Sequence, residues 1–264
     1  MPNASYSNPL QHIVINKNSR KMKKITNIIL MLCLLMQVLF AQKNPESTEI
    51  WEPKPAKVTP GEMGLPPSDA IILFSGEDLS NFESMDSTEA DWTLLNDYMT
   101  VNPGAKSIRT KQKFGDCQLH IEWLTPVSDT NGGQFKGNSG IFLMERYEIQ
   151  ILDSWENKTY SNGQAASIYK QYIPLVNACK KPGEWQSYDI IFIAPKFSKS
   201  GNVISPAKIT VLHNGVLVQN NVSLLGPTEY TGMPVYKVHG DKEPIVIQNH
   251  GDFVSFRNIW IREL

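Results

Sequence analysis

Cysteine is scarce in this chain of 264 residues, and no two cysteines stand in a Cys-x-x-Cys spacing. Three cysteines cannot build a dense disulfide scaffold, and without that spacing there is no signature of structural zinc. An excess of charge of one sign is also missing, because 25 Lys and Arg face 26 Asp and Glu, for a formal net charge of -1. A basic surface of the kind that binds nucleic acid is therefore excluded, and we expect no nucleic-acid partner.

Three common enzyme motifs are absent: a Gly-rich phosphate loop, a His-Glu-x-x-His pair and a Gly-x-Ser-x-Gly elbow. Nucleotide-dependent, zinc-peptidase and serine-esterase chemistry are therefore without support. A membrane-spanning run is missing as well, since the longest apolar run, residues 28–40, is interrupted only by Gln37 and has thirteen residues. A helix needs about 20 apolar residues to cross a bilayer.

The short apolar run has the surroundings of an export signal. Lys21, Lys23 and Lys24 precede it, and Ala41 follows it as a small residue at its end. A basic segment, a short apolar segment and a small boundary residue predict a secretory signal peptide within residues 1–41, with Met22 as a candidate start. We therefore expect export to the periplasm, cell surface or exterior of a bacterium, with no membrane attachment after cleavage.

Removal of residues 1–41 leaves 20 basic and 26 acidic residues, a net charge of -6. Residues 42–68 contain six prolines and little apolar periodicity, which is typical of an extended leader. Residues 69–264 then form the folded domain. Cys117 and Cys179 remain in it, either as a disulfide or as two separate buried thiols.

Short apolar or alternating segments predict strands throughout the domain. They are residues 71–74, 118–124, 139–144, 147–152, 187–194, 208–212, 244–248 and 254–261, separated by Gly-, Asn- and Asp-rich breaks. Asn214-Gly215 between two apolar segments is typical of a two-residue hairpin. No stretch after residue 68 has a persuasive helical pattern, so the sequence predicts an all-β fold: an antiparallel sandwich or jelly roll.

Two polar stripes interrupt these apolar strands. Arg146, Glu148 and Gln150 alternate with apolar residues and must share one face of their strand, which is either a solvated surface or a polar cleft. Gln248 and His250 share a face at the end of another strand. A histidine there is a proton acceptor, a metal ligand or simply a structural residue.

Two further residues have both a functional and a structural interpretation. Arg257 is either a clamp for a substrate oxygen or one half of a surface ion pair. Trp185 offers an aromatic face of the kind that stacks on sugars, although large aromatic residues also fill sandwich cores.

The ordered set of motifs resembles the 3-keto-disaccharide hydrolase family of secreted bacterial proteins. Residues 72–79 (ILFSGEDL) are similar to the family's opening LFNGKDLSGW, although Asn81-Phe82 stands where that pattern has Gly-Trp. The remaining matches follow in order: residues 110–119 (TKQKFGDCQL), 137–143 (GNSGIFL), 147–154 (YEIQILDS), a looser GAIY-like turn at 163–169, 182–185 (PGEW), 212–215 (LHNG), 247–251 (IQNHG) and 256–259 (FRNI).

The resemblance implies a concanavalin A-like jelly-roll β-sandwich of two antiparallel sheets, with a cleft on the concave sheet. It also implies an exported carbohydrate-active enzyme that cleaves 3-keto-disaccharides or other 3-keto-glycosides. The sequence shows no site for a redox cofactor, so a separate sugar oxidoreductase must supply the ketone.

A ketone at C3 acidifies the C2 proton, so that the glycosidic oxygen on C1 can leave by β-elimination. We assign the base to His250 or Glu148, since this cleavage needs a base near C2, a group that stabilises the enolate and an acid for the leaving group. The expected substrate-binding residues are Asn138, Arg146, Gln150, Gln248, Arg257 and Trp185. A divalent metal ion held by Glu148 and His250 is a further option for the electrophile.

Three alternatives remain open at this point. Ordinary hydrolysis would need two carboxylates, and Glu148 and Asp153 differ in strand parity, which weakens that pair unless a bulge intervenes. A lectin-like domain would bind glycan with the same amides and aromatic residues without turning it over. A purely structural exported domain is the third alternative.

Overall fold

The computed structural model describes residues 9–41, 45–62, 64–127 and 131–264. It divides into two compact units, Met1–Lys57 and Val58–Leu264. The first unit contains helix α1 (Pro9–Ala41) and the short 3-10 helix η1 (Pro45–Thr48). None of the described helices is long and apolar enough to cross a membrane. Residues 42–44, which flank the predicted cleavage point, lie outside the described residues, as do residues 1–8.

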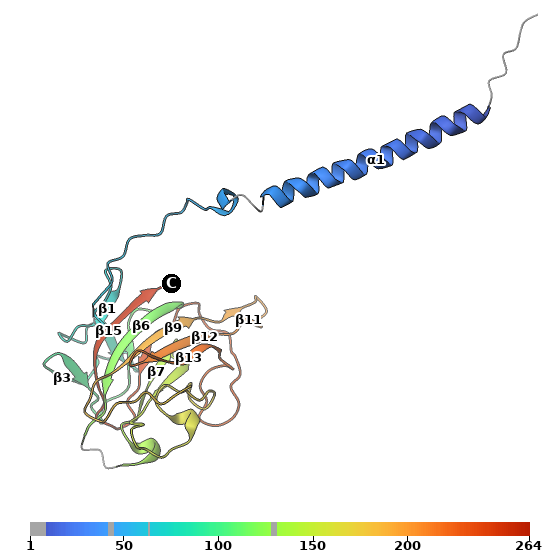
Figure 1. Cartoon of the computed structure of the whole chain (residues 1–264). Helices are drawn as coiled ribbons and strands as arrows, with labels where there is room; N and C mark the ends of the chain where they lie inside the picture. The colour runs from blue at the N-terminus through green and yellow to red at the C-terminus, as the bar shows by residue number, and fades with distance from the viewer. Residues whose placement is uncertain (1–8, 42–44, 63, 128–130) are drawn as a thin grey trace, which may run out of the picture. The chain divides into compact units, whose positions relative to one another are not determined.

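The second unit is a sandwich of antiparallel sheets, as predicted (Figure 1). The larger sheet has eight strands in the described chain, seven in one path and β1 (Ile71–Phe74) paired to β15. The path runs β13 (Val216–Ser223), β12 (Lys208–His213), β9 (Gln186–Ile193), β6 (Cys117–Leu124), β15 (Ser255–Glu263), β4 (Tyr98–Thr100) and β3 (Thr93–Leu95).

The smaller sheet has five strands and carries the pocket described below. Its order is β2 (Phe82–Ser84), β5 (Ile108–Thr110), β14 (Val246–Ile247), β7 (Ser139–Leu143) and β8 (Tyr147–Ile151). Outside both sheets lie the ribbon β10 (Lys196–Phe197) with β11 (Val203–Ser205) and the 3-10 helices η2 (Gly133–Phe135) and η3 (Ser161–Gly163).

One hydrophobic core joins the two sheets. Alternate residues of β6, among them Leu119, Ile121 and Trp123, belong to the same buried cluster as Ile149 and Ile151 of β8. Cys117 and Cys179 are both buried and free, so the structure holds them as separate thiols. Burial raises the pKa of the Cys117 thiol to about 12 and that of Cys179 to about 11, which makes both poor nucleophiles.

All eight predicted strands are present, and the predicted hairpin joins β12 to β13. Asn214 and Gly215 have φ of 52° and 77°, the left-handed values that a two-residue turn of this type requires. Residues from Val58 onward belong to the same unit as the sandwich. The Gly64 carbonyl oxygen accepts hydrogen bonds from Asn258 Nδ2 at 2.9 Å and from Trp260 Nε1 at 3.0 Å, which fastens this segment to β15.

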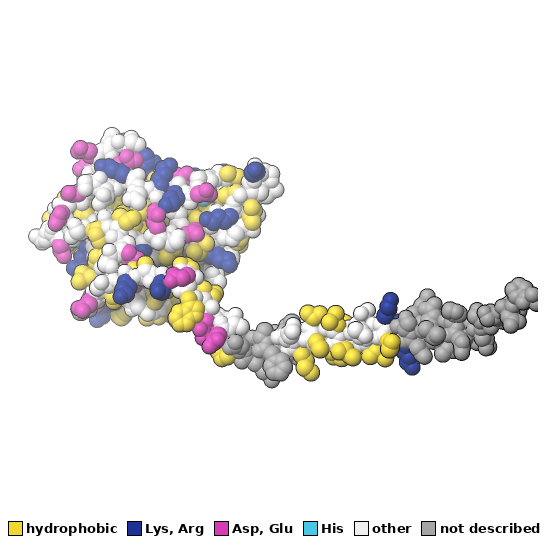
Figure 2. Space-filling view, turned by 90° about the horizontal axis from the view of Figure 1, so that it is seen from above, with side chains coloured by type: hydrophobic (Ala, Val, Ile, Leu, Met, Phe, Trp, Pro, Cys, Tyr) yellow, Lys and Arg dark blue, Asp and Glu magenta, His cyan; other side chains and the backbone are white. Residues whose placement is uncertain are grey.

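The face of the molecule in Figure 2 carries acidic and basic side chains that are interspersed over the sandwich. No large patch of one sign dominates this face, in keeping with the nearly balanced charge of the sequence.

Candidate functional site

The smaller sheet turns a row of polar residues away from the core. Ile149 and Ile151 of β8 point into the core, so Glu148 and Gln150 must face the other way. Across the β7–β8 pair, Glu148 stands opposite Phe142, and Gln150 opposite Gly140. On the other side of β7, the Gln248 N–H donates to the Gly140 carbonyl oxygen at 2.9 Å. Three neighbouring strands thereby bring their polar side chains to one surface.

A pocket of about 660 Å³ opens over this surface. The strands supply its floor, and loops before β7, after β8, after β13 and after β14 supply its walls. The lining residues are Gln134, Phe135, Asn138, Phe142, Glu148, Gln150, Tyr160, Tyr169, Lys170, Thr228, Tyr230, Gln248 and His250. A volume of this size accommodates a ligand of two or more rings.

Amide side chains hold one another in place on the floor. Gln150 Nε2 donates to Asn138 Oδ1 at 3.2 Å, and Asn138 Nδ2 donates to the Gln134 carbonyl oxygen at 2.6 Å. Gln134 is anchored in turn, because its Nε2 donates to Thr159 Oγ1 at 2.8 Å. Amides fixed in this way present donors and acceptors without a net charge, which suits the hydroxyl groups of a sugar.

Glu148 is the carboxyl group of the pocket. Its side chain is 5% exposed, and burial raises its pKa to about 8. Nothing beside it offsets this desolvation, so the group holds a proton at neutral pH. Gly140 leaves the space that the carboxyl group occupies, because a Cβ at position 140 would lie 2.7 Å from Glu148 Oε1.

Gln248 and His250 form the wall next to β14. Gln248 Oε1 is buried and has no hydrogen-bond partner among the described residues. A buried acceptor left open beside a pocket is explained by a ligand that donates to it, such as a sugar hydroxyl. His250 is exposed to solvent at the pocket, where a neutral imidazole can accept a proton.

The rim of the pocket is aromatic. Phe135 is 70% exposed and Tyr230 is 76% exposed, while the Tyr160 and Tyr169 hydroxyls are hydrogen-bonded at 2.6 Å. Burial, the bond to Tyr160 and the nearby Glu148 raise the pKa of Tyr169. Exposed aromatic faces around an amide floor are typical of sites that bind sugar rings.

Comparison with known proteins identifies the family. The model of the 3-keto-alpha-glucoside-1,2-lyase-like domain matches residues 69–262. The chain belongs to this family. It is also 50% identical, with a TM-score of 0.81, to a crystallised "putative glycosyl hydrolase" from Parabacteroides distasonis ATCC 8503, over 84% of this chain and 97% of that one.

Two further Parabacteroides distasonis structures with the same description share the fold. One has 18% identity and a TM-score of 0.55 over 74% of this chain and 94% of that one. The other has 23% identity and a TM-score of 0.50 over 74% and 99%. No match was found among curated proteins. Family and neighbours together support a carbohydrate-active function of the hydrolase type.

Five of the eight predicted site residues of this lyase-like domain line the pocket together: Asn138, Glu148, Gln150, Gln248 and His250. Arg146 does not line it. Met144 and Glu145 adopt left-handed φ of 53° and 59°, so the regular alternation begins only at Tyr147. The Arg146 Nη1 donates to the Met144 carbonyl oxygen at 2.7 Å.

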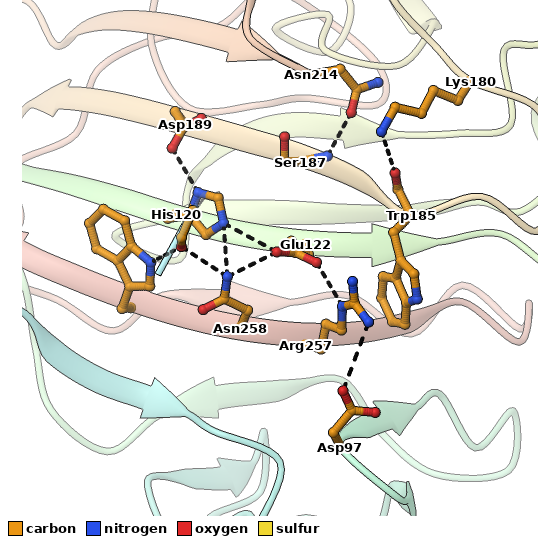
Figure 3. A network of polar contacts seen from close by, with 12 residues as sticks. Asp97, His120, Glu122, Lys180, Trp185, Ser187, Asp189, Asn214, Arg257 and Asn258 are labelled. Atoms are coloured by element: carbon orange, nitrogen blue, oxygen red, sulfur yellow. Dashed lines mark hydrogen bonds and ion pairs between the residues drawn. The ribbon is translucent and has the colours of Figure 1, made fainter. Parts of the chain in front are cut away.

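Arg257 and Trp185 are also absent from the pocket lining, and they lie together on the larger sheet (Figure 3). The guanidinium carbon of Arg257 lies 4.2 Å from the centre of the Trp185 ring, and its Nε donates to Glu122 Oε2 at 2.7 Å. The alternative interpretation of Arg257 as one half of an ion pair agrees with this contact. Strand periodicity does not say which sheet carries these two residues.

Figure 3 shows that Arg257 belongs to a network of its own. His120 Nδ1 lies 2.7 Å from Asp189 Oδ1, and Asn258 Nδ2 donates to Glu122 Oε1 at 2.9 Å. Burial acts to lower the pKa of His120, but its contacts with Asp189 and Glu122 outweigh burial and raise that pKa to about 9. Every one of these side chains is engaged within the protein, which indicates a structural role for the network.

The pocket's donor set does not fit the metal ion that we considered for Glu148 and His250. In the described part of the chain, no three His, Cys, Asp or Glu side chains are grouped to hold a metal ion. Glu148 and His250 would be two protein ligands, fewer than the three that catalytic zinc sites use. The amide side chains around them are weak metal ligands.

The sequence did not predict eight of the lining residues. One is Phe142 of β7, and loops bring the other seven: Gln134, Phe135, Tyr160, Tyr169, Lys170, Thr228 and Tyr230. One available signal was the clustering of Tyr160, Tyr169 and Lys170 in a segment with two Asn, two Gln and a Gly, residues 157–172. Large aromatic residues in such a segment have little core to enter and are candidates for a binding surface.

Proposed function

We propose that this protein cleaves the glycosidic bond of 3-keto-glycosides by β-elimination followed by hydration. The observation that carries the proposal is the pocket's acid–base content: a buried carboxyl group with a raised pKa and an exposed histidine line the same pocket, together with amide side chains. Among the described lining residues, Glu148 is the carboxyl group and His250 the imidazole. Elimination needs this asymmetric pair, a proton acceptor and a proton donor.

His250 takes the proton from C2, and the electron pair of that C–H bond forms the enolate with the C3 ketone. The enolate then re-forms the ketone as the C1–O bond breaks, which leaves a C1=C2 double bond conjugated with the ketone. Glu148 gives its proton to the departing oxygen. In the hydration step the Glu148 carboxylate takes a proton from the water whose oxygen adds to C1, and His250 returns its proton to C2. Both residues regain their starting states, and the net reaction is hydrolysis.

The amides hold the sugar during these steps. Asn138 and Gln150 are fixed by their mutual hydrogen bond, and Gln248 offers an open buried acceptor. Groups that are already oriented stabilise the charge of the enolate without reorganisation cost at the moment of reaction.

Ordinary hydrolysis by two carboxylates finds less support. Asp153, the candidate second carboxylate, is buried outside the pocket lining, and its Oδ2 lies 3.0 Å from Lys136 Nζ. The pair of carboxyl groups that flank the bond in most glycosidases is therefore not assembled by Glu148 and Asp153.

The proposed setting is the periplasm, cell surface or exterior of a bacterium, reached through the signal in residues 1–41. The ketone must be introduced by a separate oxidoreductase acting on the same glycoside. This protein then consumes the oxidised product.

The test follows sugar release from a 3-keto-disaccharide and from its unoxidised parent, with protein expressed from the full sequence, with and without EDTA. We expect cleavage of the oxidised sugar alone, unaffected by EDTA. Glu148→Gln and His250→Gln should each lower kcat by about 10²- to 10⁴-fold, the usual contribution of a general acid or base.

Other outcomes point elsewhere. Cleavage of the unoxidised parent would replace elimination by conventional hydrolysis, and loss of activity in EDTA would require a metal ion. Binding of either sugar without cleavage would make the protein a lectin. In a lectin, Glu148→Gln should weaken sugar binding only in part, and neither the wild type nor the variant should cleave the sugar.

A further inference from the structure

Lys170 stands at the end of a segment that runs along the free edge of β8. The Ala166 N–H donates to the Gln150 carbonyl oxygen at 2.9 Å, and the Tyr169 N–H to that of Glu148 at 3.4 Å. Lys170 then turns the chain with a left-handed φ of 58°, and its N–H donates to the Asn162 carbonyl oxygen at 2.8 Å. Such a conformation is unfavourable for lysine, and in proteins it is concentrated at functional sites.

The side chain of Lys170 is held as firmly as its backbone. Its Nζ donates to the Tyr230 carbonyl oxygen at 2.6 Å and lies 4.0 Å from the centre of the Tyr230 ring. It also lies 5.7 Å from the centre of the Tyr169 ring. Fixing a lysine side chain costs conformational entropy, and the hydrogen bond to Tyr230 and the two contacts with aromatic rings offset this cost. The ammonium group therefore occupies a defined place at the rim.

Lys170 is also a cation without an acidic partner. It is the one Lys or Arg among the described residues that line the pocket, and none of the ion pairs in the described chain includes it. Lys136, in a neighbouring loop, is paired with Asp153 at 3.0 Å. An ammonium group has three N–H donors, of which one goes to Tyr230 and two remain for a ligand.

The position at the rim indicates which part of a glycoside the ammonium group meets. Glu148 and the amides lie on the floor, where the proposed chemistry holds the keto-sugar. Lys170 is exposed and lies over Tyr230, which is itself 76% exposed. The leaving group, which extends from C1 toward solvent, is then the part that reaches this rim.

We propose that Lys170 makes the pocket select 3-keto-glycosides whose leaving group carries a carboxylate, bound by the ammonium group beside the Tyr230 ring. The inference rests on the proposed cleavage reaction and adds the class of leaving group to it. Two chemistries supply such a group: an aromatic acid linked through its phenol oxygen, and a uronic acid linked as the second sugar.

The test compares two matched substrate pairs. The first pair is the 3-keto-glucosides of 4-hydroxybenzoate and 4-hydroxybenzamide, and the second is a 3-keto-disaccharide ending in glucuronic acid or in glucose. For at least one pair, wild-type kcat/KM should favour the anionic member about fivefold, or about 1 kcal/mol. The favoured pair identifies the source of the carboxylate, and added salt should reduce the preference.

For the pair that shows the preference, Lys170→Met should have the same kcat/KM for the anionic and the neutral member. Lys170→Arg should keep most of the wild-type preference for the anionic member. Lys158→Met is the matched control, because Lys158 is exposed and does not line the pocket. Its ratio should equal that of the wild type.

Three outcomes would overturn the inference: no anionic preference in the wild type, a preference that survives in Lys170→Met, or equal losses for both members of each pair. If Lys170→Met lowered kcat/KM equally for both members of each pair, Lys170 would act by holding the Tyr230 loop in place or by taking part in the reaction. If the wild type cleaves no keto-glycoside, the proposed function fails by itself. Binding of glucuronic acid against glucose, and of 4-hydroxybenzoate against 4-hydroxybenzamide, then decides the Lys170 inference independently.

Discussion

Individual carboxyl groups on the smaller sheet differ sharply in their surroundings. Glu83 and Glu145 both pair with Arg109, at 2.8 Å and 3.1 Å. Glu148 has no such cation, and desolvation alone accounts for its raised pKa of about 8. Burial without a neighbouring cation favours the protonated form of a carboxyl group, so Glu148 is the one of these three glutamates that is suited to act as an acid.

The alkaline limb of the pH profile should therefore report on Glu148. Because the protonated form is the donor, kcat/KM for a 3-keto-disaccharide should fall about tenfold per pH unit above about pH 8. Glu148→Gln should be slow and should lack this limb. Glu184→Gln, which changes an exposed carboxyl group outside the pocket, should keep it. A limb that persists in Glu148→Gln would assign the acid to another group.

At the scale of elements, the β7–β8 pair places the acid. The register sets Gly140 opposite Gln150 and next to Gln248, so the glycine lies in the middle of the floor. A Cβ there would lie 2.7 Å from Glu148 Oε1 and 3.0 Å from the Phe142 ring. The absence of a side chain at this point is what allows the carboxyl group to lie against the sheet.

Gly140→Ala should therefore displace the Glu148 carboxyl group. We expect kcat/KM to fall by about 10- to 100-fold, because small misplacements of a catalytic group are costly. The free energy of unfolding should fall by about 1–3 kcal/mol, as overpacking usually costs. Gly132→Ala is the control, since a Cβ at position 132 meets nothing within 4 Å. Urea denaturation and steady-state kinetics separate the two effects, and full activity in Gly140→Ala would contradict this role for the glycine.

At the scale of the whole molecule, the two sheets have different roles. The smaller sheet carries the pocket, while the larger sheet carries the network of His120, Glu122, Asp189, Arg257 and Asn258. The network adjoins the segment that Gly64 fastens to β15. His120 is buried and its partners Glu122 and Asp189 are partly exposed, so removing a partner would leave the buried imidazole with less compensation for its charge.

His120 makes this stability depend on pH. Its pKa is raised from 6.5 to about 9, so its stabilising contribution is complete below about pH 6.5 and disappears as pH rises through about 9. The contribution is about 3 kcal/mol at its largest. The difference in unfolding free energy between wild type and His120→Gln should shrink accordingly between about pH 6 and about pH 10 in urea titrations. A difference that is independent of pH would show that His120 is neutral in the folded protein.

Much of the fold could be predicted from the sequence, and with it five of the thirteen residues that line the pocket. Alternation assigned Glu148 and Gln150 to one face and Ile149 and Ile151 to the core, and the structure agrees. The pattern failed at Arg146, where two left-handed residues interrupt the strand. It also had no means of assigning Arg257 and Trp185 to the larger sheet.

By itself, the sequence determined the eight predicted strands, the Asn214-Gly215 hairpin, the family and the polar side of β8, because these depend on residues that are neighbours along the chain. It did not predict the short strands β2, β3, β4, β5, β10 and β11. Only the tertiary structure decided which polar residues meet. Lys170 reaches Tyr230 across sixty positions, and Asn138 and Gln248 come together through strand pairing in the smaller sheet. Burial has the same origin, since folding removes the Glu148 carboxyl group from water, and its raised proton affinity follows from that desolvation.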